Sequence, residues 1–191
     1  MAEASKKYEL VKDDTVRTWD GRTLFRIRAL VAIAAIGVAV GDLGGYVESE
    51  KNLSQVSDNA WVSDNAWVSG DAWVSDNAWV SDNARVYGNA QVYGNARVYG
   101  DARVSHRNHL GWFSCVGSEH GTLCWFLEKD RGIRVNRGCF SGTLDEFSAA
   151  VEESHGDSPN GQQYRLLIQF IELRAAEALK DFTSAAEAEA A

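Results

Sequence analysis

A repeat of six residues between positions 56 and 105 constrains the fold of this chain more than any other feature of its sequence. Valine returns at every sixth position, an alanine precedes eight of these valines by two residues, and a variable residue stands between the two. The valines are Val56, Val62, Val68, Val74, Val80, Val86, Val92, Val98 and Val104. The alanines are Ala60, Ala66, Ala72, Ala78, Ala84, Ala90, Ala96 and Ala102. The variable residues are Trp61, Trp67, Trp73, Trp79, Arg85, Gln91, Arg97 and Arg103.

Each hexad predicts a very short strand followed by a corner. In Ala-x-Val, side chains alternate, so Ala and Val point to one side and x points to the other. The residues that follow, Ser-Asp-Asn or Tyr-Gly-Asn, tolerate left-handed backbone and form turns. No step is long enough to pair with its neighbour in a hairpin, so we expect a coil whose successive turns stack in register. Burying the valines contributes about 15 to 25 kcal/mol gross, which is enough to organise the chain.

The hexads resemble a known family. Val-Ser-Asp-Asn-Ala-Trp and Val-Tyr-Gly-Asn-Ala-Arg are similar to the hexapeptide repeat of left-handed parallel β-helices. That resemblance implies a triangular prism with three hexads, or roughly 18 residues, per coil, and a homotrimer. The period continues weakly at Leu110 and Val116, so we expect the coils to reach residue 118.

A broader resemblance, to uncharacterised phage and prophage hexapeptide-repeat proteins, covers most of the chain. It rests on Gly41-Asp-Leu-Gly-Gly-Tyr-Val-Glu-Ser-Glu-Lys-Asn-Leu-Ser54 and on the segment from Gly132 to Phe147. It implies a viral origin and a place in the host cell cytoplasm.

The residues before the repeat predict a cap. Asp20-Gly21 lies between two alternating segments and predicts a hairpin with a type I′ turn, which covers the first open coil. The apolar run Ala29 to Val40 is 12 residues long, shorter than the roughly 20 that span a bilayer, and we interpret it as core. The polar segment Met1 to Leu10 is not expected to be a signal peptide.

The residues after the repeat predict a small ββαα module. Leu123–Leu127 and Ile133–Phe140 are typical of strands, Thr143-Leu-Asp-Glu146 is a capping box at a helix start, and a last helix begins near Gln162. That helix has a heptad-like apolar seam at Tyr164, Ile168, Ile171, Ala175, Ala178 and Phe182. The expected fold is therefore mainly β: an N-terminal hairpin and lead-in cap (1–40), a left-handed parallel β-helix (41–118) and a C-terminal α+β module ending in a long helix (119–191).

Composition excludes several functions. A net charge of -8 and a pI near 5.0 argue against binding to nucleic acid or to membrane surfaces, which both favour a cationic face. The cysteines Cys115, Cys124 and Cys139 form an odd number without framework spacing, which favours a reducing cytosol. With His120 they match no compact zinc pattern, so we expect buried structural cysteines.

Three hexads per coil divide the variable residues among three outer faces. One carries Trp61, Trp79 and Arg97, the second Trp67, Arg85 and Arg103, and the third Trp73, Gln91 and His109. The four Trp expose too much apolar surface for a bare monomer. They either pack against the hairpin, the C-terminal region or a second subunit, or they form with Arg a platform that stacks a flat ligand.

Other polar residues give weaker hypotheses. Asp58 with Asp76, and Asp64 with Asp82, stack at corners but supply too few oxygens for a hard cation, so we expect neither a metal nor a cofactor. His106 or His109 is a candidate general base of a hexapeptide-repeat acyltransferase, although no orienting partner is identifiable. Arg131, Arg134, Arg137 and Asn136 are typical of the solvated side of a strand, or of an anion-binding patch.

Taken together, the sequence favours a non-catalytic, trimeric phage-type β-helix protein that acts by binding or scaffolding. Its expected partners are a host protein, such as a defence factor that it inhibits, or a nucleotide-like small molecule, such as a signalling nucleotide that it sequesters. An acyltransferase and a structural component of the virion are the alternatives. The candidate binding residues are Trp61, Trp67, Trp73, Trp79, Arg85, Arg97, Arg103, His109 and Arg134.

Overall fold

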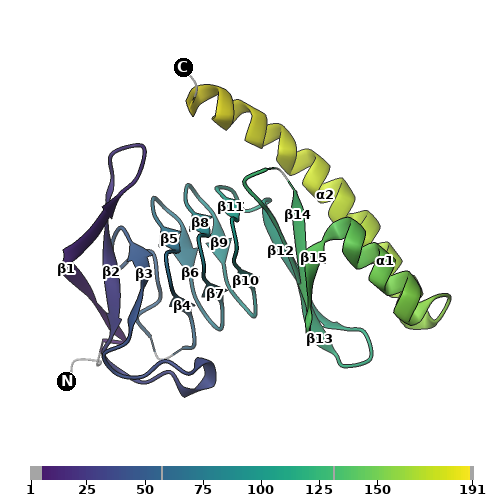
Figure 1. Ribbon diagram of the computed structural model, residues 1–191, viewed down its shortest axis with the longest axis horizontal. Coiled ribbons are helices and arrows are strands. Elements are labelled where there is room, and N and C mark those ends of the chain that lie inside the picture. Colours follow the sequence, from purple (N-terminus) through teal and green to yellow (C-terminus); the bar gives the residue numbers. More distant parts are fainter. Residues whose placement is uncertain (1–5, 57, 131, 190–191) are drawn as a thin grey trace. The chain divides into compact units, whose positions relative to one another are not determined.

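The computed structural model describes residues 6–56, 58–130 and 132–189 in two compact units, Met1–His106 and Arg107–Ala191 (Figure 1). The first unit consists of β1 (Tyr8–Arg17), β2 (Thr23–Ala29), the 3-10 helix η1 (Ala34–Ile36), β3 (Leu43–Val47), β4 (Trp61–Val62), β5 (Trp67–Val68), β6 (Trp73–Val74), β7 (Trp79–Val80), β8 (Arg85–Val86), β9 (Gln91–Val92), β10 (Arg97–Val98) and β11 (Arg103–Val104). The second consists of β12 (Leu110–Val116), β13 (Gly121–Leu127), β14 (Ile133–Arg137), β15 (Phe140–Thr143), α1 (Leu144–His155) and α2 (Pro159–Glu189).

The hexads form the coils of a β-solenoid. Trp67 pairs in parallel with Arg85 in the next coil, 18 positions later, and its amide donates to the carbonyl of Ala84 at 2.9 Å. The parallel ladders run through β3, β5, β8 and β11, through β4, β7 and β10, and through β6 and β9. These three ladders are the faces of the solenoid, and they confirm the expected mainly β fold with three hexads per coil.

The interior of the solenoid is a uniform stack of small aliphatic side chains. All eight alanines of the repeat and the eight valines from Val62 to Val104 are buried. Val56, in contrast, is 67% exposed, so its expected place in the core is wrong. The inward position is taken by Leu53, which forms a parallel bridge with Val74. The Gln55 side chain forms hydrogen bonds with the backbone of Lys7 and Tyr8, and the chain departs from the regular coil at this point.

The corners repeat as regularly as the core. Seven positions spaced by six residues have left-handed backbone with φ between 56° and 67°: Asp64, Gly70, Asp76, Asp82, Gly88, Gly94 and Gly100. Each corner Asp also binds the next coil, as where Oδ2 of Asp76 accepts from the amide of Gly94 and Oδ2 of Asp82 from that of Gly100, both at 2.9 Å. The corner carboxylates therefore stabilise the turns. The repeat indicates the same role, because Gly replaces Asp at the other corners.

The predicted N-terminal hairpin is present and joins the solenoid as extra strands. β1 pairs antiparallel with β2, and β2 pairs antiparallel with β3, whose other side carries β5. The expected type I′ turn is wrong: the amide of Gly21 donates to Thr18 and that of Thr18 to Arg22, and only Gly21 has positive φ. This is a three-residue loop with a G1 bulge.

Lys7 fastens the hairpin to the first coil. Its ammonium group is buried and donates to Oδ1 of Asp58 at 2.5 Å and to the carbonyl of Ala60 at 2.9 Å. Burial lowers the pKa of Lys7, which the bond to Asp58 partly offsets. The neighbouring Tyr8 hydroxyl donates to the carbonyl of Leu53 at 2.9 Å. The backbone at the open end of the solenoid therefore has partners in Lys7 and in Tyr8 of β1.

The apolar run Ala29 to Val40 is not core, contrary to the prediction. Of its residues only Ala29 and Ile33 are buried, and Val40 is 66% exposed. The run leaves the sheet after β2 and folds back on itself through η1, and none of the elements among the described residues covers most of its side chains.

The second unit contains more β-strands than the expected ββαα module. Its sheet has four antiparallel strands in the order β12-β13-β14-β15. The segment expected to continue the coils to residue 118 is β12, which pairs antiparallel with β13, so the hexad period ends at Val104. The segment 133–140 is divided between β14 and β15 by a turn at Gly138, which has φ of 59°.

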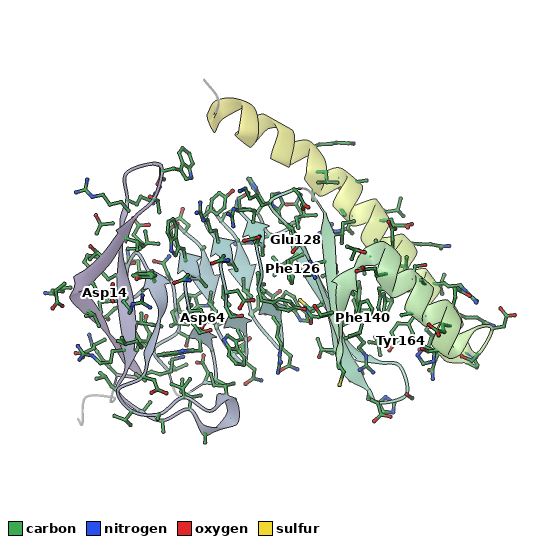
Figure 2. The ribbon with its side chains drawn as sticks, in the orientation of Figure 1. Asp14, Asp64, Phe126, Glu128, Phe140 and Tyr164 are labelled. Carbon is green, nitrogen blue, oxygen red and sulfur yellow. The ribbon has the colours of Figure 1, made fainter. Side chains whose placement is uncertain are left out.

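Both helices cover this sheet with apolar residues. The capping box at Thr143 and Glu146 is confirmed, and α1 ends before Gly156. The last helix, α2, begins at Pro159, three residues before the predicted Gln162. The seam of α2 is buried from Tyr164 to Ala178, and the side chain of Phe182 lies outside the described residues. Phe147 of α1 contacts Phe140 and Tyr164, which Figure 2 labels between the sheet and the helices. No helix in the described residues is long and apolar enough to span a membrane.

Candidate ligand groove

One outer face of the solenoid carries a column of large side chains in register. Tyr46 of β3 pairs with Trp67 of β5, Trp67 with Arg85 of β8, and Arg85 with Arg103 of β11. Since parallel strands lie roughly 4.8 Å apart, these side chains stack along the solenoid axis. The second predicted face, Trp67, Arg85 and Arg103, is thus confirmed as a column, and Tyr46 extends it toward the hairpin.

The stack of Arg85 on Trp67 is the centre of this column. The guanidinium carbon of Arg85 lies 4.4 Å from the centroid of the Trp67 ring, and both side chains are half-buried. The stacking explains how the chain itself covers one side of Trp67. Within the described part of the chain, Arg85 forms no ion pair or hydrogen bond, so its charge and its donors face the surroundings.

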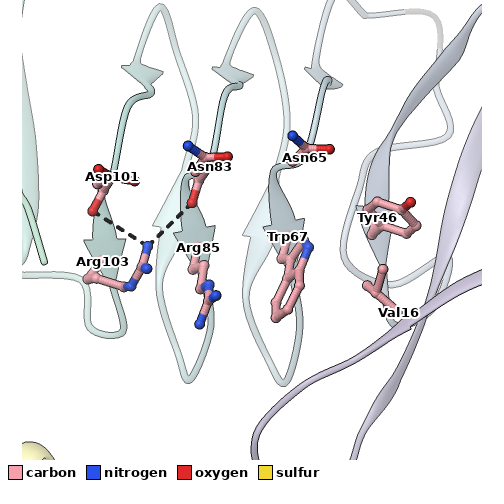
Figure 3. A pocket seen from close by; sticks show the side chains of 8 residues that line it. All are labelled: Val16, Tyr46, Asn65, Trp67, Asn83, Arg85, Asp101 and Arg103. Carbon is pink, nitrogen blue, oxygen red and sulfur yellow. Dashed lines mark hydrogen bonds between the residues drawn. The ribbon is translucent and has the colours of Figure 1, made fainter.

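These side chains line a groove with a volume of about 400 Å³. Figure 3 shows its eight lining residues: Val16, Tyr46, Asn65, Trp67, Asn83, Arg85, Asp101 and Arg103. Asn65, Asn83 and Asp101 come from corners two residues before the column and 18 residues apart, so they form a parallel polar edge. Val16 of β1 brings the hairpin to the wall beside Tyr46.

Arg103 closes the other end of the groove. Its Nη1 donates to the carbonyl oxygens of Asn83 at 3.3 Å, Asp101 at 3.5 Å and Ala102 at 3.0 Å. The dashed lines in Figure 3 mark two of these contacts. These bonds hold the Arg103 guanidinium at this end of the groove.

The wall at the hairpin end is held by a partly buried polar network. Arg26 stacks over the ring of Tyr46 at 4.2 Å, its Nε donates to Oδ2 of Asp14 at 2.6 Å, and its Nη1 donates to the carbonyl of Gly44 at 2.8 Å. Tyr46 also donates to Oδ1 of Asp14 at 3.2 Å. Burial raises the pKa of Tyr46, with opposing contributions from Arg26 and Asp14. Arg26 is therefore occupied within the wall, and Arg85 and Arg103 are the cations of the groove.

The Trp side chains of the other two faces do not line this groove and have contacts within the solenoid. Trp61 is buried, Trp79 lies 5.9 Å below Arg97 and donates from Nε1 to Oγ of Ser63 at 2.9 Å, and Trp73 pairs with Gln91. Trp73 and Trp79 are half-buried. Coverage by residues of the next coil, rather than by a ligand, accounts for much of this Trp surface.

The candidate histidines are not among the residues that line the groove. His109 is buried directly before β12, and its carbonyl accepts from the amide of Leu127 at 3.0 Å. The ladder of the third face contains only β6 and β9, so the expected continuation from Gln91 to His109 is wrong. His106 contacts Oγ of Ser105 through Nδ1 at 2.9 Å. Neither residue lines the groove.

The other candidate sites are used within the protein. Arg134 forms an ion pair with Glu128 at 2.7 Å, and Arg137 donates to the carbonyl of Val116 at 2.8 Å. Arg131 lies outside the described residues. Across the described ranges, no three His, Cys, Asp or Glu residues gather in a geometry that holds a metal ion.

Sequence reasoning missed five of the eight lining residues. Four of them lie outside the column, namely Val16, Asn65, Asn83 and Asp101, and the fifth, Tyr46, lies within it. The spacing of 18 residues that relates Trp67, Arg85 and Arg103 also relates Asn65, Asn83 and Asp101, so the repeat alone could have predicted this polar edge. The repeat could not have predicted Tyr46 and Val16, because Tyr46 pairs with Trp67 over an irregular interval and β1 contains a bulge.

Comparison with known proteins supports the repeat architecture. Residues 54–70, 78–94 and 90–106 match a family model described as the YdcK beta solenoid repeat. These matches fall on the coils that carry the groove. A search of curated proteins found none that matches this chain. The coils are thus similar to a repeat β-helix family, in agreement with the ladders of the structure.

Proposed function

We propose that this protein is a non-catalytic binding protein and that the groove over Trp67 and Arg85 takes a flat, anionic small molecule of the nucleotide class. The observation that carries the proposal is the Arg85 guanidinium, which stacks on Trp67 and has no acidic partner among the described residues. A half-buried cation beside an aromatic ring provides both a charge and an apolar surface for such a ligand.

The dimensions and chemistry of the groove support a small ligand. A volume of about 400 Å³ lies within the range of small-molecule sites. Arg85 and Arg103 are suited to a phosphate or carboxylate, because guanidinium groups bind planar or tetrahedral anions through paired donors. The side chains of Asn65, Asn83 and Asp101 offer donors and acceptors to the edge of a base.

The same residues argue against catalysis at this place. The lining contains no His, Cys or Lys, and its one carboxylate, Asp101, is exposed at a corner. An exposed carboxylate without a buried neighbour is a weak general base at neutral pH. The alternative, an acyltransferase that uses His106 or His109, predicts thermal stabilisation by acetyl-CoA, since a ligand of the native state raises stability by mass action.

The wider context of the proposal rests on sequence resemblance. It includes a left-handed solenoid, a homotrimer and a viral origin, with action in the host cytoplasm on a signalling nucleotide or a defence factor. Static light scattering tests the trimer, which a mass of 21.0 kDa in solution would refute.

The binding proposal is tested by titrating AMP, ADP, cyclic AMP and cyclic dinucleotides while following tryptophan fluorescence. We expect quenching by at least one anionic nucleotide and weaker quenching by the matching nucleoside. Arg85→Gln should weaken binding by roughly tenfold or more, because it removes a charge-assisted contact. Arg97→Gln is the matched control: Arg97 occupies the same hexad position over Trp79 on another face and should leave affinity unchanged.

A flat fluorescence response to the whole panel would overturn the small-molecule proposal and would favour a protein partner or a structural role in the virion. Equal losses in Arg85→Gln and Arg97→Gln would place binding outside the groove. Both variants keep the buried stack of Ala and Val, so unfolding is not expected to confuse the comparison.

A further inference from the structure

The charged side chains that line the groove limit the charge of the ligand that it can hold. Arg85 and Arg103 are the cations of the lining and Asp101 is its anion (Figure 3), so the lining has a formal charge of +1. The wall beside Tyr46 adds no net charge, because Arg26 forms an ion pair with Asp14 at 2.6 Å. The groove therefore balances about one negative charge.

The corners that border the groove are acidic. Asp64 and Asp82 directly precede the lining residues Asn65 and Asn83. Their carboxylates accept from backbone amides of the next coil, which holds both charges at the corner. The whole chain also has a net charge of -8. A polyanion that enters the groove is attracted by two guanidinium groups and repelled by the carboxylates around them.

We propose that the groove selects a nucleotide with a single negative charge, the phosphodiester of a cyclic mononucleotide, over phosphomonoesters and polyphosphates of the same base. This inference rests on the proposed function and adds the charge class of its ligand. A phosphodiester carries a single negative charge, whereas a phosphomonoester carries about -1.5 to -2 at pH 7. The single charge matches the lining, and every further charge is opposed by Asp101 and the corner carboxylates.

Asp101 is the residue that sets this preference. In its column, Asn65 and Asn83 present an amide at the equivalent position, and Asp101 presents a carboxylate two residues before Arg103. The turn does not depend on this carboxylate, since the left-handed residue of the corner is Gly100. Within the described part of the chain, the Asp101 carboxylate forms no ion pair or hydrogen bond. Its charge is therefore directed at the surroundings of the groove.

The test measures the dissociation constants of adenosine, cyclic AMP, AMP and ADP by tryptophan fluorescence at neutral pH. These four ligands share a base and a ribose and differ in charge. The wild-type chain should bind cyclic AMP most tightly. Asp101→Asn should tighten the binding of AMP and ADP relative to that of cyclic AMP by roughly threefold to tenfold, the effect of one charge across a solvated contact. Comparing ratios between variants removes the differences in ligand shape.

The matched control is Asp71→Asn, which changes the net charge of the chain equally. Asp71 follows Gly70 as Asp101 follows Gly100, but it lies at another corner and does not line the groove. It should leave the ratios of the dissociation constants unchanged. Both variants install the residue that the repeat has at most corners, so both are expected to fold.

Two results would overturn the charge preference and leave the proposed function in place. One is tighter binding of AMP, ADP or a cyclic dinucleotide than of cyclic AMP by the wild-type chain. The other is the same ratio of dissociation constants in Asp101→Asn and Asp71→Asn. A lack of binding by all four ligands and by the cyclic dinucleotides would instead overturn the proposed function, and this inference with it.

Discussion

Replacing Gly88 by Ala tests the stacking of the corners, because the structure gives this glycine a matched control in the same column. Gly88 and Gly70 have almost the same backbone, with φ of 61° and 67°. A Cβ on Gly88 would lie 2.4 Å from the carbonyl oxygen of Ser105, whereas a Cβ on Gly70 would lie 3.3 Å from its nearest atom, the amide nitrogen of Gly88. The two substitutions share the backbone strain and differ in the space available.

The magnitudes follow from these two contributions. Left-handed backbone costs an Ala about 1 to 2 kcal/mol, and the loss of unfolded-state entropy returns about 0.4 to 1 kcal/mol. Gly70→Ala should therefore lower the free energy of unfolding by up to about 1.6 kcal/mol. Gly88→Ala must in addition move the backbone of two coils apart, which costs about 1 to 3 kcal/mol more by analogy with overpacked cores.

The assay is urea unfolding monitored by tryptophan fluorescence. Five of the seven tryptophans lie in the first unit, so the signal reports mainly on that unit. Substitution by Asn separates the cost of backbone strain from the cost of the steric clash, since Asn tolerates left-handed backbone but still carries a Cβ. We expect Gly70→Asn to approach the wild type and Gly88→Asn to stay destabilised. Equal stability of Gly70→Ala and Gly88→Ala would refute the close approach of the corner to the coil that ends at Ser105.

Two further predictions concern ionic contacts in each unit. Lys7→Met should destabilise the first unit by about 2 to 3 kcal/mol in urea unfolding, because it leaves Asp58 and the carbonyl of Ala60 without their buried partner; no change would contradict the role of Lys7 in fastening the hairpin. In α1, the amide of Thr143 lowers the pKa of Glu146, and Arg165 lowers that of Glu152. The stability that each carboxylate contributes is present above its unfolded pKa of about 4.3 and is lost as the pH falls through the lower folded value. Thermal melts from pH 6 to pH 3 should show this loss, and Glu146→Gln should reduce it; an identical pH profile would contradict the contribution of Glu146.

Most of the solenoid was predictable because one spacing determines several features at once. Alternation within Ala-x-Val sets the buried side, and the corner residues Asp and Gly set the left-handed backbone. Val56 shows the limit of this inference. It fits the period, yet Gln55 finds backbone partners in β1, a contact between distant parts of the chain that no local pattern reveals.

The flanks were predicted less well for physical reasons that can be named. The run from Ala29 to Val40 has the composition of a core, but composition does not say whether another element covers it. Gly138-Cys139 is a two-residue hairpin turn, and the alternation on its two sides was interpreted as one strand. Leu110 and Val116 keep the hexad spacing by coincidence, since they belong to β12, which pairs antiparallel with β13 and has a register shift between Phe113 and Val116.

The candidate site was predicted as a column and not as a groove. The three members Trp67, Arg85 and Arg103 follow from the repeat. Their distinction from Trp61, Trp73 and Trp79 does not, because all four Trp occupy equivalent positions in the hexad. What separates them is the hairpin, which places Val16 and the buried Tyr46 at the end of one face alone.

The most direct test of this account is a ¹H–¹⁵N spectrum of the indole groups during titration with AMP. The chain has seven tryptophans, so each indole can be assigned by single Trp→Phe substitutions. The account predicts that the Trp67 indole shifts first and furthest, that Trp73 and Trp79 shift little, and that Arg85→Gln suppresses the shift of Trp67. Shifts confined to Trp73 or Trp79, or a Trp67 shift that persists in Arg85→Gln, would contradict the assignment of the groove as the ligand site.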